Sequence, residues 1–502
     1  MRLQIRRCWH GCVAPKLPIT DVNLLPLFPV AAIRLLRKLL LSYGRRMDGE
    51  RMLASSRRGA VRAAIQAARS SAAYRALLQE HRVEPSSLSA QTDLAALPVL
   101  TKANTFGRFS LDQLARPTPA KELADVLTSS GRGGHSFGFR LTARGQHETS
   151  WFDIDLGLQD VFKVDQYATL LVNCLPMGVV FRSRAVAVAN VSVREDMACS
   201  ILRDVGPRFQ QTLLCTDPLF IRRLLDEARV AGVDWKALNT SVIIGEEVMV
   251  EAQRDYLAAR MGFDPDHDSQ RLIGSSFGVG ELGLNLLFET RETIRMRRAM
   301  RLQPEVAQLL SGKSDVGSVP CVFCYNPLRC YIEVLNPDSD GFGELCFTML
   351  DPQAIIALPR YSTGDFGKRV SRQDAAQAAQ LAQTSPPWLP VVVVKGRIQD
   401  RPTGMPSVES IKELIYLDHA AADQLTGAFR IEKNDAGVVK LTLQTNSERA
   451  AEDAGLRQQL LTLMSGRQLG PLDLGLLAPL AFPYRPMLDY ERKFIYLATA
   501  AQ

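Results

Sequence analysis

Hydrophobic positions recur along this chain with two spacings, and each spacing predicts a different kind of element. The alanine-rich stretch 49–81 has its apolar residues at helical spacing, which predicts one helix or a pair of helices. Short β-branched runs at 169–175, 241–245 and 391–396 predict strands, and helix-like stretches lie between them. Alternation of strands and helices predicts an α/β domain with a largely parallel sheet.

The pattern changes after residue 400. Breaker residues crowd into 401–406 and the segments beyond are shorter, so we place a domain boundary near residue 399. The tail predicts a small α+β unit with strands at 429–433, 438–445 and near 494–497, a turn at 434–437 and a helix at about 450–464. The sequence thus predicts a basic leader that is partly helical or flexible at 1–48, a large N-terminal domain at 49–398 and a small C-terminal domain at 399–502.

Net charge is concentrated in the leader. The chain has 502 residues and a formal charge of +7. Residues 1–46 carry nine Lys or Arg against the single acid Asp21, which leaves 51 basic and 52 acidic residues in the rest. This near-neutral body excludes a basic nucleic-acid-binding face. Nine cysteines without regular spacing are typical of a reducing compartment, so we expect a cytoplasmic protein.

The leader contains one apolar segment, at 24–41. Pro26 and Pro29 interrupt it, and basic residues follow, so it is too short and too broken to span a membrane. Three alternatives stay open for it: a helix packed on the protein, a flexible leader, or an amphipathic helix at a membrane interface.

A Ser/Gly-rich loop at 127–136 is the first segment with candidate chemistry. Backbone amides and hydroxyls in such a loop can hold a polyphosphate, because glycine permits close approach. Its candidate nucleotide-binding residues are Ser129, Ser130, Gly131, Gly133 and Gly134. A plain connecting loop is the alternative.

The second segment is the glycine-rich turn 276–283. Phe277 can stack on a purine beside Gly278, and Glu281 can bind the Mg²⁺ that accompanies ATP, because magnesium prefers oxygen ligands. A loop with a capping acid is the alternative.

The third segment is the most specific and has three parts, at 343–345, 358–367 and 395–400. Asp365 on a tight Thr-Gly turn can accept hydrogen bonds from both ribose hydroxyls of a nucleotide. Arg397, which follows, can add a charge-assisted contact. This order and spacing is hard to produce by chance.

Together these segments resemble the phosphate loop, the aromatic-Gly-x-Thr-Glu motif, the Arg-Tyr-x-Thr-Gly-Asp motif and the Gly-Arg-x-x-Asp hinge of the adenylate-forming superfamily, in the expected order. The segment 72–106 is similar to the opening of phenylacetate-CoA ligases and their relatives in particular. Glu247 lies in a Gly-x-Glu segment that this branch places near the adenine. The likeness extends over about 50–497.

The resemblance implies ATP-dependent activation of a small carboxylic acid to an acyl-adenylate, followed by transfer to CoA. It implies ATP and Mg²⁺ as cofactors, with Glu281 as metal ligand and catalytic residue. Lys493 matches the catalytic lysine that the family brings from its small domain, which rotates about a hinge near Asp400 between the two steps. A homodimer is compatible with this family.

The phosphate loop departs from the family pattern. Arg132, Gly133, Gly134, His135 and Ser136 replace the usual Thr-Thr-Gly-Lys-Pro, and Gly280 replaces a threonine. Arg132 can supply a guanidinium fork for phosphate and is therefore a candidate catalytic residue. The alternatives are acyl transfer to an amine or a carrier-protein thiol, and a catalytically silent nucleotide-binding homologue.

Cysteines raise one further alternative. Cys321, Cys324, Cys330 and Cys346 can in principle supply four zinc ligands, although no second Cys-x2-Cys pair is present, and buried free thiols are the default. None of the six histidines lies in a recognisable nucleophile context, so the sequence does not indicate a Ser/His/Asp hydrolase.

Overall fold

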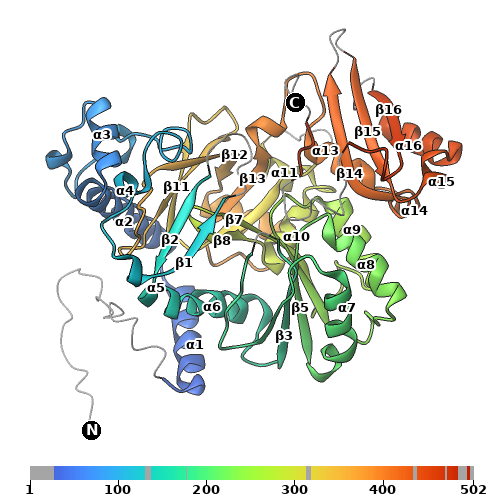
Figure 1. Cartoon of the computed structure of the whole chain (residues 1–502), viewed down its shortest axis with the longest axis horizontal. Coiled ribbons are helices and arrows are strands. Elements are labelled where there is room, and N and C mark those ends of the chain that lie inside the picture. The colour runs from blue at the N-terminus through green and yellow to red at the C-terminus, as the bar shows by residue number, and fades with distance from the viewer. Residues whose placement is uncertain are drawn as a thin grey trace.

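A mixed sheet of eleven strands forms the centre of the molecule (Figure 1). The computed structural model describes residues 28–129, 137–176, 178–312, 318–433, 438–467, 469, 472–483 and 494–497. In spatial order the strands are β10 (Cys330–Leu335), β11 (Gly343–Met349), β12 (Tyr361–Arg369), β13 (Val391–Arg397), β9 (Cys321–Tyr325), β8 (Gly283–Phe288), β7 (Ile273–Val279), β6 (Thr240–Ile244), β5 (Gln211–Thr216), β3 (Thr169–Asn173) and β4 (Ala187–Asn190). The predicted α/β class is confirmed.

The sheet has a parallel and an antiparallel half. Strands β4, β3, β5, β6 and β7 pair in parallel, whereas every pairing from β7 to β10 is antiparallel. Parallel neighbours need long crossovers, which helices supply here, and the antiparallel half contains strands joined by short turns. The prediction of a largely parallel sheet is therefore correct only for the half formed by β4, β3, β5, β6 and β7. A separate two-stranded ribbon consists of β1 (Leu123–Thr128) and β2 (Phe139–Ala143).

Helices cover both faces of the large sheet, and hydrophobic clusters lie in each interface. Helices α7 to α9 pack on one face of the parallel half and α6 on the other. Helices α2 and α3 cover one face of the antiparallel half, and α10 to α12 the opposite one. The helices of the large part are α1 (Val30–Arg46), α2 (Gly49–Ser70), α3 (Ala72–Glu80), α4 (Leu111–Leu114), α5 (Arg144–Thr149), α6 (Trp151–Phe162), α7 (Glu195–Asp204), α8 (Phe220–Val230), α9 (Glu251–Arg260), α10 (Arg291–Ala299), α11 (Pro304–Ser311) and α12 (Arg372–Leu381).

The stretch 49–81 forms two helices, which is one of the two predicted arrangements. Ser71 separates α2 from α3, and its hydroxyl accepts a hydrogen bond from the Tyr74 amide at 3.1 Å. This N-cap satisfies a donor that the first turn of a helix leaves unpaired. The apolar faces of both helices are buried, which fixes them on the sheet.

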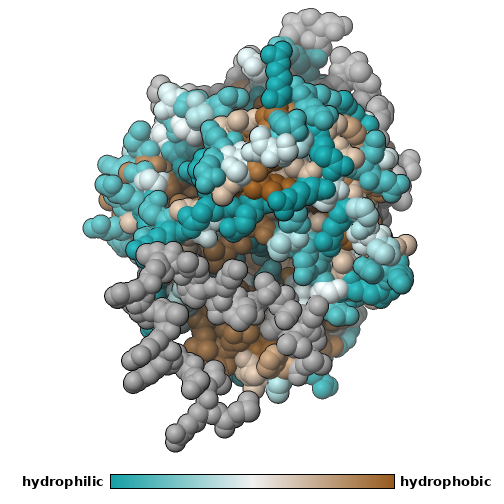
Figure 2. All heavy atoms as spheres, turned by 90° about the vertical axis from the view of Figure 1, so that its left-hand side faces the viewer, coloured by the Kyte–Doolittle hydropathy of each residue, from teal (hydrophilic) through white to brown (hydrophobic). Residues whose placement is uncertain are grey.

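Helix α1 packs on α6 through polar contacts. Arg37 is 2% exposed; its Nη1 lies 3.1 Å from an oxygen of Asp155, and its Nε donates to Gln159 at 2.7 Å. The outer side of α1 exposes Leu35, Leu39 and Tyr43 by 52–58%. Figure 2 looks onto this side of the molecule and shows hydrophobic surface in its lower part. No helix in the described ranges is long and apolar enough to cross a membrane.

The C-terminal unit has a three-stranded sheet of β14 (Leu425–Lys433), β15 (Val439–Thr445) and β16 (Leu472–Leu477), with helices α13 (Val408–Tyr416), α14 (His419–Ala422), α15 (Glu448–Ala451) and α16 (Ala454–Gly466). The parallel strand β16 was not predicted. Near the predicted last strand, Leu497 forms a single bridge with Ile431. The predicted turn at 434–437 lies outside the described residues.

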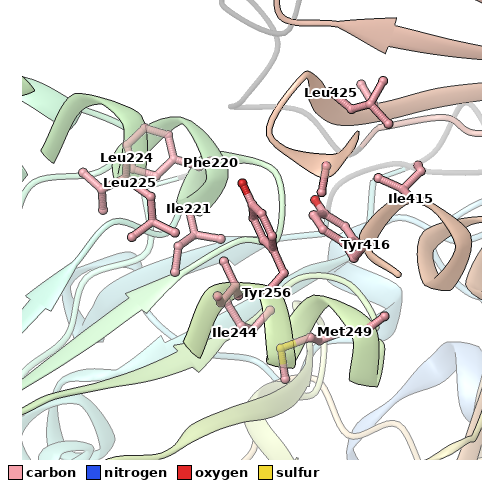
Figure 3. Packing of buried hydrophobic residues seen from close by; sticks show 14 of the residues in the cluster. Phe220, Ile221, Leu224, Leu225, Ile244, Met249, Tyr256, Ile415, Tyr416 and Leu425 are labelled. Atoms are coloured by element: carbon pink, nitrogen blue, oxygen red, sulfur yellow. The ribbon is translucent and has the colours of Figure 1, made fainter. Parts of the chain in front are cut away.

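A continuous hydrophobic cluster joins this unit to the parallel half of the large part. Tyr416 of α13 packs on Tyr256 of α9 with ring centroids 5.3 Å apart (Figure 3). Polar contacts surround this core: Asp423 accepts from Arg260 at 2.6 Å and from the Tyr256 hydroxyl at 2.8 Å. The two parts are therefore docked through a buried apolar interface with charged contacts at its edge.

Candidate active site

A cavity of about 1620 Å³ lies on the face of the sheet that α2 and α6 cover. Thr363 and Gly364 of β12, which lie in the strand and not in the turn expected from the sequence, form one part of its wall together with Arg397 at the end of β13. Apolar side chains form another part and come from α1 and the residue that caps it (Leu40, Leu41, Met47), from α6 (Phe152, Ile154, Leu158, Val161, Phe162) and from residues in or just after strands (Leu175, Ile243, Leu284). Polar and apolar regions therefore share one space.

Four polar residues meet on the polar part of the wall. Lys102 donates to the Ser129 hydroxyl at 2.7 Å, and its Nζ lies 3.1 Å from Oε1 of Glu281. Tyr361 donates from its hydroxyl to the same oxygen at 3.3 Å. Burial and the adjacent Glu281 carboxylate raise the pKa of Tyr361 well above its usual range, so this hydroxyl stays a donor. The cluster links the phosphate loop, the glycine-rich turn and β12.

Local backbone pairing positions Lys102. The segment before it runs beside β12: the Leu100 amide donates to the Arg360 carbonyl at 2.9 Å, and the Ser362 amide donates to the Leu100 carbonyl at 2.8 Å. Thr101 and Asn104 then close a tight turn, because each side chain accepts from the other's backbone amide. Lys102 is thereby directed toward the cavity.

Gly280 has a steric role at the same place. A Cβ on this residue would lie 2.7 Å from the Thr128 carbonyl oxygen and 2.9 Å from the Ser129 Cα. Any side chain here would push the glycine-rich turn off the phosphate loop. The threonine that the family has at this position would not fit at Gly280, because the two backbones approach each other too closely.

Asp365 and Arg397 lie opposite each other on β12 and β13. Oδ1 of Asp365 is 3.9 Å from Nε of Arg397, and Asp365 is 4% exposed. Arg397 lines the cavity, as do Thr363 and Gly364, which precede Asp365 in β12, whereas Asp365 itself does not line it. The two residues predicted for the ribose are thus neighbours, and their role stays a prediction.

Two predicted nucleotide contacts have other partners. The Phe277 ring stacks on Phe347 with centroids 5.9 Å apart and does not line the cavity, whereas Gly278 does. Glu247 accepts from Lys412 of α13 at 2.7 Å and from the Tyr496 hydroxyl at 2.6 Å. Its neighbours Gly245 and Glu246 face the cavity instead. Glu247 thus joins the large part to the C-terminal unit.

Several candidates lie outside the described residues. These are Ser130, Gly131, Arg132, Gly133 and Gly134 of the phosphate loop and Lys493 near the C-terminus. Their roles stay predictions.

Sequence reasoning did not single out Lys102 or the hydroxyl of Tyr361. Both lie within segments that carried the family likeness, but a lysine after a turn and a buried tyrosine are common in any protein. Only the pairing of Leu100 with β12 brings them to Glu281. The apolar wall from α1 was missed for a similar reason, because no local signal says where a leader helix docks.

Glu281 is suited to a magnesium site in which the phosphates of ATP supply further oxygen ligands. Mg²⁺ is commonly held by one or two carboxylates together with phosphate oxygens and water. Glu281 lines the cavity beside Ser129, so one carboxylate is available next to the phosphate loop. Within the described ranges no group of three or more His, Cys, Asp or Glu is arranged to hold a metal by itself.

The four cysteines of the zinc alternative are not gathered around one point. Cys321 packs in the cluster under α2, and Cys324 packs in the cluster under α10 to α12 on the opposite face of the sheet. All four are free and buried, and burial raises the pKa of Cys321 and of Cys330 to about 12. Protonated, separated thiols do not make a tetrahedral site.

The large sheet with one parallel and one antiparallel half and the small α+β unit are arranged as in a solved CoA ligase. The chain is similar to a 2-hydroxyisobutyryl-CoA ligase in the postadenylation state with an acyl-AMP, at 13% identity over 90% of each chain and a TM-score of 0.62. An open conformation of that ligase with 2-HIB-AMP and CoA gives a TM-score of 0.51 over 90% of this chain and 91% of that one. No family model matches the sequence, and no curated protein matches it. At this identity the likeness shows the fold, and the phenylacetate-CoA ligase branch stays a prediction.

Proposed function

We propose that the protein activates a carboxylic acid with ATP to form an acyl-adenylate and then transfers the acyl group to CoA. The observation that carries the proposal is the meeting of Lys102, Ser129 and Glu281 on the same cavity wall as Arg397. These residues provide phosphate-binding and ribose-binding groups in one space, and the apolar wall beside them suits an acyl group.

In the first step, a carboxylate oxygen of the acid attacks the α-phosphorus of ATP and pyrophosphate leaves. Two anions must approach each other, so positive charge near the phosphates lowers the barrier. Lys102 supplies a cation beside the phosphate loop, and Arg397 holds the ribose side with Asp365. Mg²⁺ bound through Glu281 would neutralise phosphate charge. In the second step, the CoA sulfur attacks the acyl carbon and AMP leaves.

The direct test is carboxylate-dependent exchange of pyrophosphate into ATP with a broad panel of acids. We expect exchange with at least one acid in the wild type. Glu281→Gln should lower the exchange by about 100-fold, because an amide binds Mg²⁺ more weakly than a carboxylate and the cation that neutralises the reacting phosphates is lost. Glu305→Gln is the matched control, since Glu305 is exposed on α11 and does not line the cavity.

A second assay identifies the acceptor. Acyl-CoA formation is measured beside reactions in which CoA is replaced by an amine or a carrier-protein thiol. Exchange without acyl-CoA would refute the transfer step. Calorimetric binding of ATP without exchange for any acid would favour the catalytically silent homologue and contradict the proposal as a whole.

A further inference from the structure

Two arginines approach each other beside Gly283 in the cavity wall. Arg140 lies on β2, and Arg329 lies in the turn between β9 and β10; both line the cavity. A Cβ built on Gly283 would be 2.7 Å from Nη1 of Arg140 and 3.5 Å from Nη2 of Arg329. The two guanidinium groups therefore share the space that a side chain at Gly283 would fill, and they lie within reach of one ligand.

The Arg140 guanidinium makes no hydrogen bond or ion pair with any residue that the structure describes, although its side chain is partly buried. Arg329 is anchored by donating to the carbonyls of Asn285 at 3.1 Å and Leu284 at 3.0 Å. Burial and the charge of Arg329 lower the pKa of Arg140. Two like charges in a partly dry site are unfavourable unless an anion joins them.

Carboxylates are nearby but do not pair with Arg140. Asp351, Asp125 and Asp153 act on it electrostatically, but none forms an ion pair with it. Asp351 is already occupied, because it accepts from the Gln146 side chain at 2.7 Å and from the Gln353 amide at 2.8 Å. The nearby acids reduce the excess positive charge and leave the guanidinium donors open to a ligand.

The pair is close to the proposed reacting groups. Gly283 lies two residues after Glu281, at the end of the turn between β7 and β8, so their Cα atoms are at most about 7 Å apart. A Cβ on Gly138, two residues before Arg140, would overlap the Glu281 carboxylate. Gly138 and Gly283 therefore place both Arg140 and the glycine beside it close to Glu281. In the other direction β8 leads to Asn285, which is 3.9 Å from the Cβ position of Gly157 on α6. The pair thus lies between Glu281 and the apolar wall.

We infer that Arg140 and Arg329 form an anion subsite that binds a carboxylate or phosphoryl group of a reactant, apart from the carboxylate that reacts. The anion is either a second acidic group on the acid or part of the polyphosphate of ATP. Two guanidinium groups suit both, because each can donate two parallel hydrogen bonds to such oxygens. The inference rests on the proposed function only for the identity of these reactants.

Calorimetry on the full chain tests the subsite without requiring turnover. The probes are pyrophosphate and a series of linear dicarboxylates of increasing length, each beside the monocarboxylate of equal length. Arg140→Gln should weaken binding of the responsive anion by about 10- to 100-fold, the loss expected for charge-assisted hydrogen bonds. Arg144→Gln is the matched control, because Arg144 is exposed and does not line the cavity.

The outcomes separate the two sources. Weaker pyrophosphate binding with unchanged dicarboxylate binding assigns the pair to the polyphosphate. Loss of the preference for dicarboxylates over monocarboxylates assigns it to the acid. Equal binding by the folded Arg140→Gln variant, or no binding of either probe by the wild type, refutes the subsite. Anion binding that depends on Arg140 without any pyrophosphate exchange would refute the proposed function and leave the subsite standing.

Discussion

Replacing Arg37 with methionine removes the buried charged contact between α1 and α6 and leaves the more exposed pair of Arg45 with Asp160 in place. The guanidinium loses its ion pair with Asp155 and its hydrogen bond to Gln159, while methionine keeps much of the apolar stem. Both side chains of the ion pair are almost fully buried, at 2% and 0% exposure. Asp155 keeps its hydrogen bonds from the Ser183 hydroxyl and the Arg184 amide but loses its countercharge.

Truncating one partner of a buried ion pair costs about 3–5 kcal/mol. This cost can appear in two ways. If the docking of α1 contributes less than about 3–5 kcal/mol, α1 detaches while the rest of the protein stays folded. If docking contributes more, α1 stays in place and the free energy of unfolding falls by about 3–5 kcal/mol. In the first case the cavity loses the part of its wall that Leu40, Leu41 and Met47 supply. We then also expect a higher KM for the acid and an unchanged KM for ATP.

The assays are chemical unfolding and limited trypsin digestion, which attacks the basic end of α1 once it is detached. Arg34→Met is the matched control, because it makes the same change at an exposed position of the same helix. The double variant Arg37→Met with Asp155→Asn should recover part of the stability, since no unpaired charge stays buried and an amide oxygen can still accept from Ser183 or Arg184. Equal unfolding midpoints and equal cleavage rates for Arg37→Met and Arg34→Met would refute the reasoning.

Three further predictions concern other parts of the molecule. Lys102→Met should lower pyrophosphate exchange by about 10- to 100-fold, through loss of charge-assisted hydrogen bonds; unchanged exchange would exclude Lys102 from the phosphate site. Burial raises the pKa of Asp217 to about 7, so the folded state holds a proton that the unfolded state releases near pH 4. Stability should fall as pH rises between these values, by at most about 1.4 kcal/mol per unit, and Asp217→Asn should flatten a urea-unfolding profile; an unaltered slope would contradict this. Leu414→Ala should cost about 2–5 kcal/mol and keep one unfolding transition, because Leu414 belongs to the shared core; a separate early transition would argue against that core.

The buried interface of the C-terminal unit opposes the rotation that the family resemblance implies. A pivot at Asp400 would carry α13 away from α9, and Ile411, Leu414 and Ile415 would lose their buried environment. The contact between Lys412 and Glu247 would break as well. A rotation of the whole segment 399–502 therefore has to replace an apolar interface with another one.

Local patterns were enough for much of the fold. Amphipathic spacing located α2 and α3, and β-branched runs located β3, β6 and β13, because these signals lie within one element. Strand β16 was missed because it is short and contains Asp473 and Gly475, which a strand pattern does not favour. Its position depends on pairing with β15, which is a long-range contact.

The candidate site divides in the same way. The sequence by itself determined that Asp365, Arg397 and Glu281 lie in motifs suited to a nucleotide, because spacing within a turn or a strand pair is a local property. Only the tertiary structure decided that Lys102 joins Glu281, that Phe277 packs on Phe347 and that Glu247 binds Lys412. The partner of each of these side chains depends on packing between elements far apart in the chain. The sequence leaves such choices open, because one strand or helix does not specify what covers it.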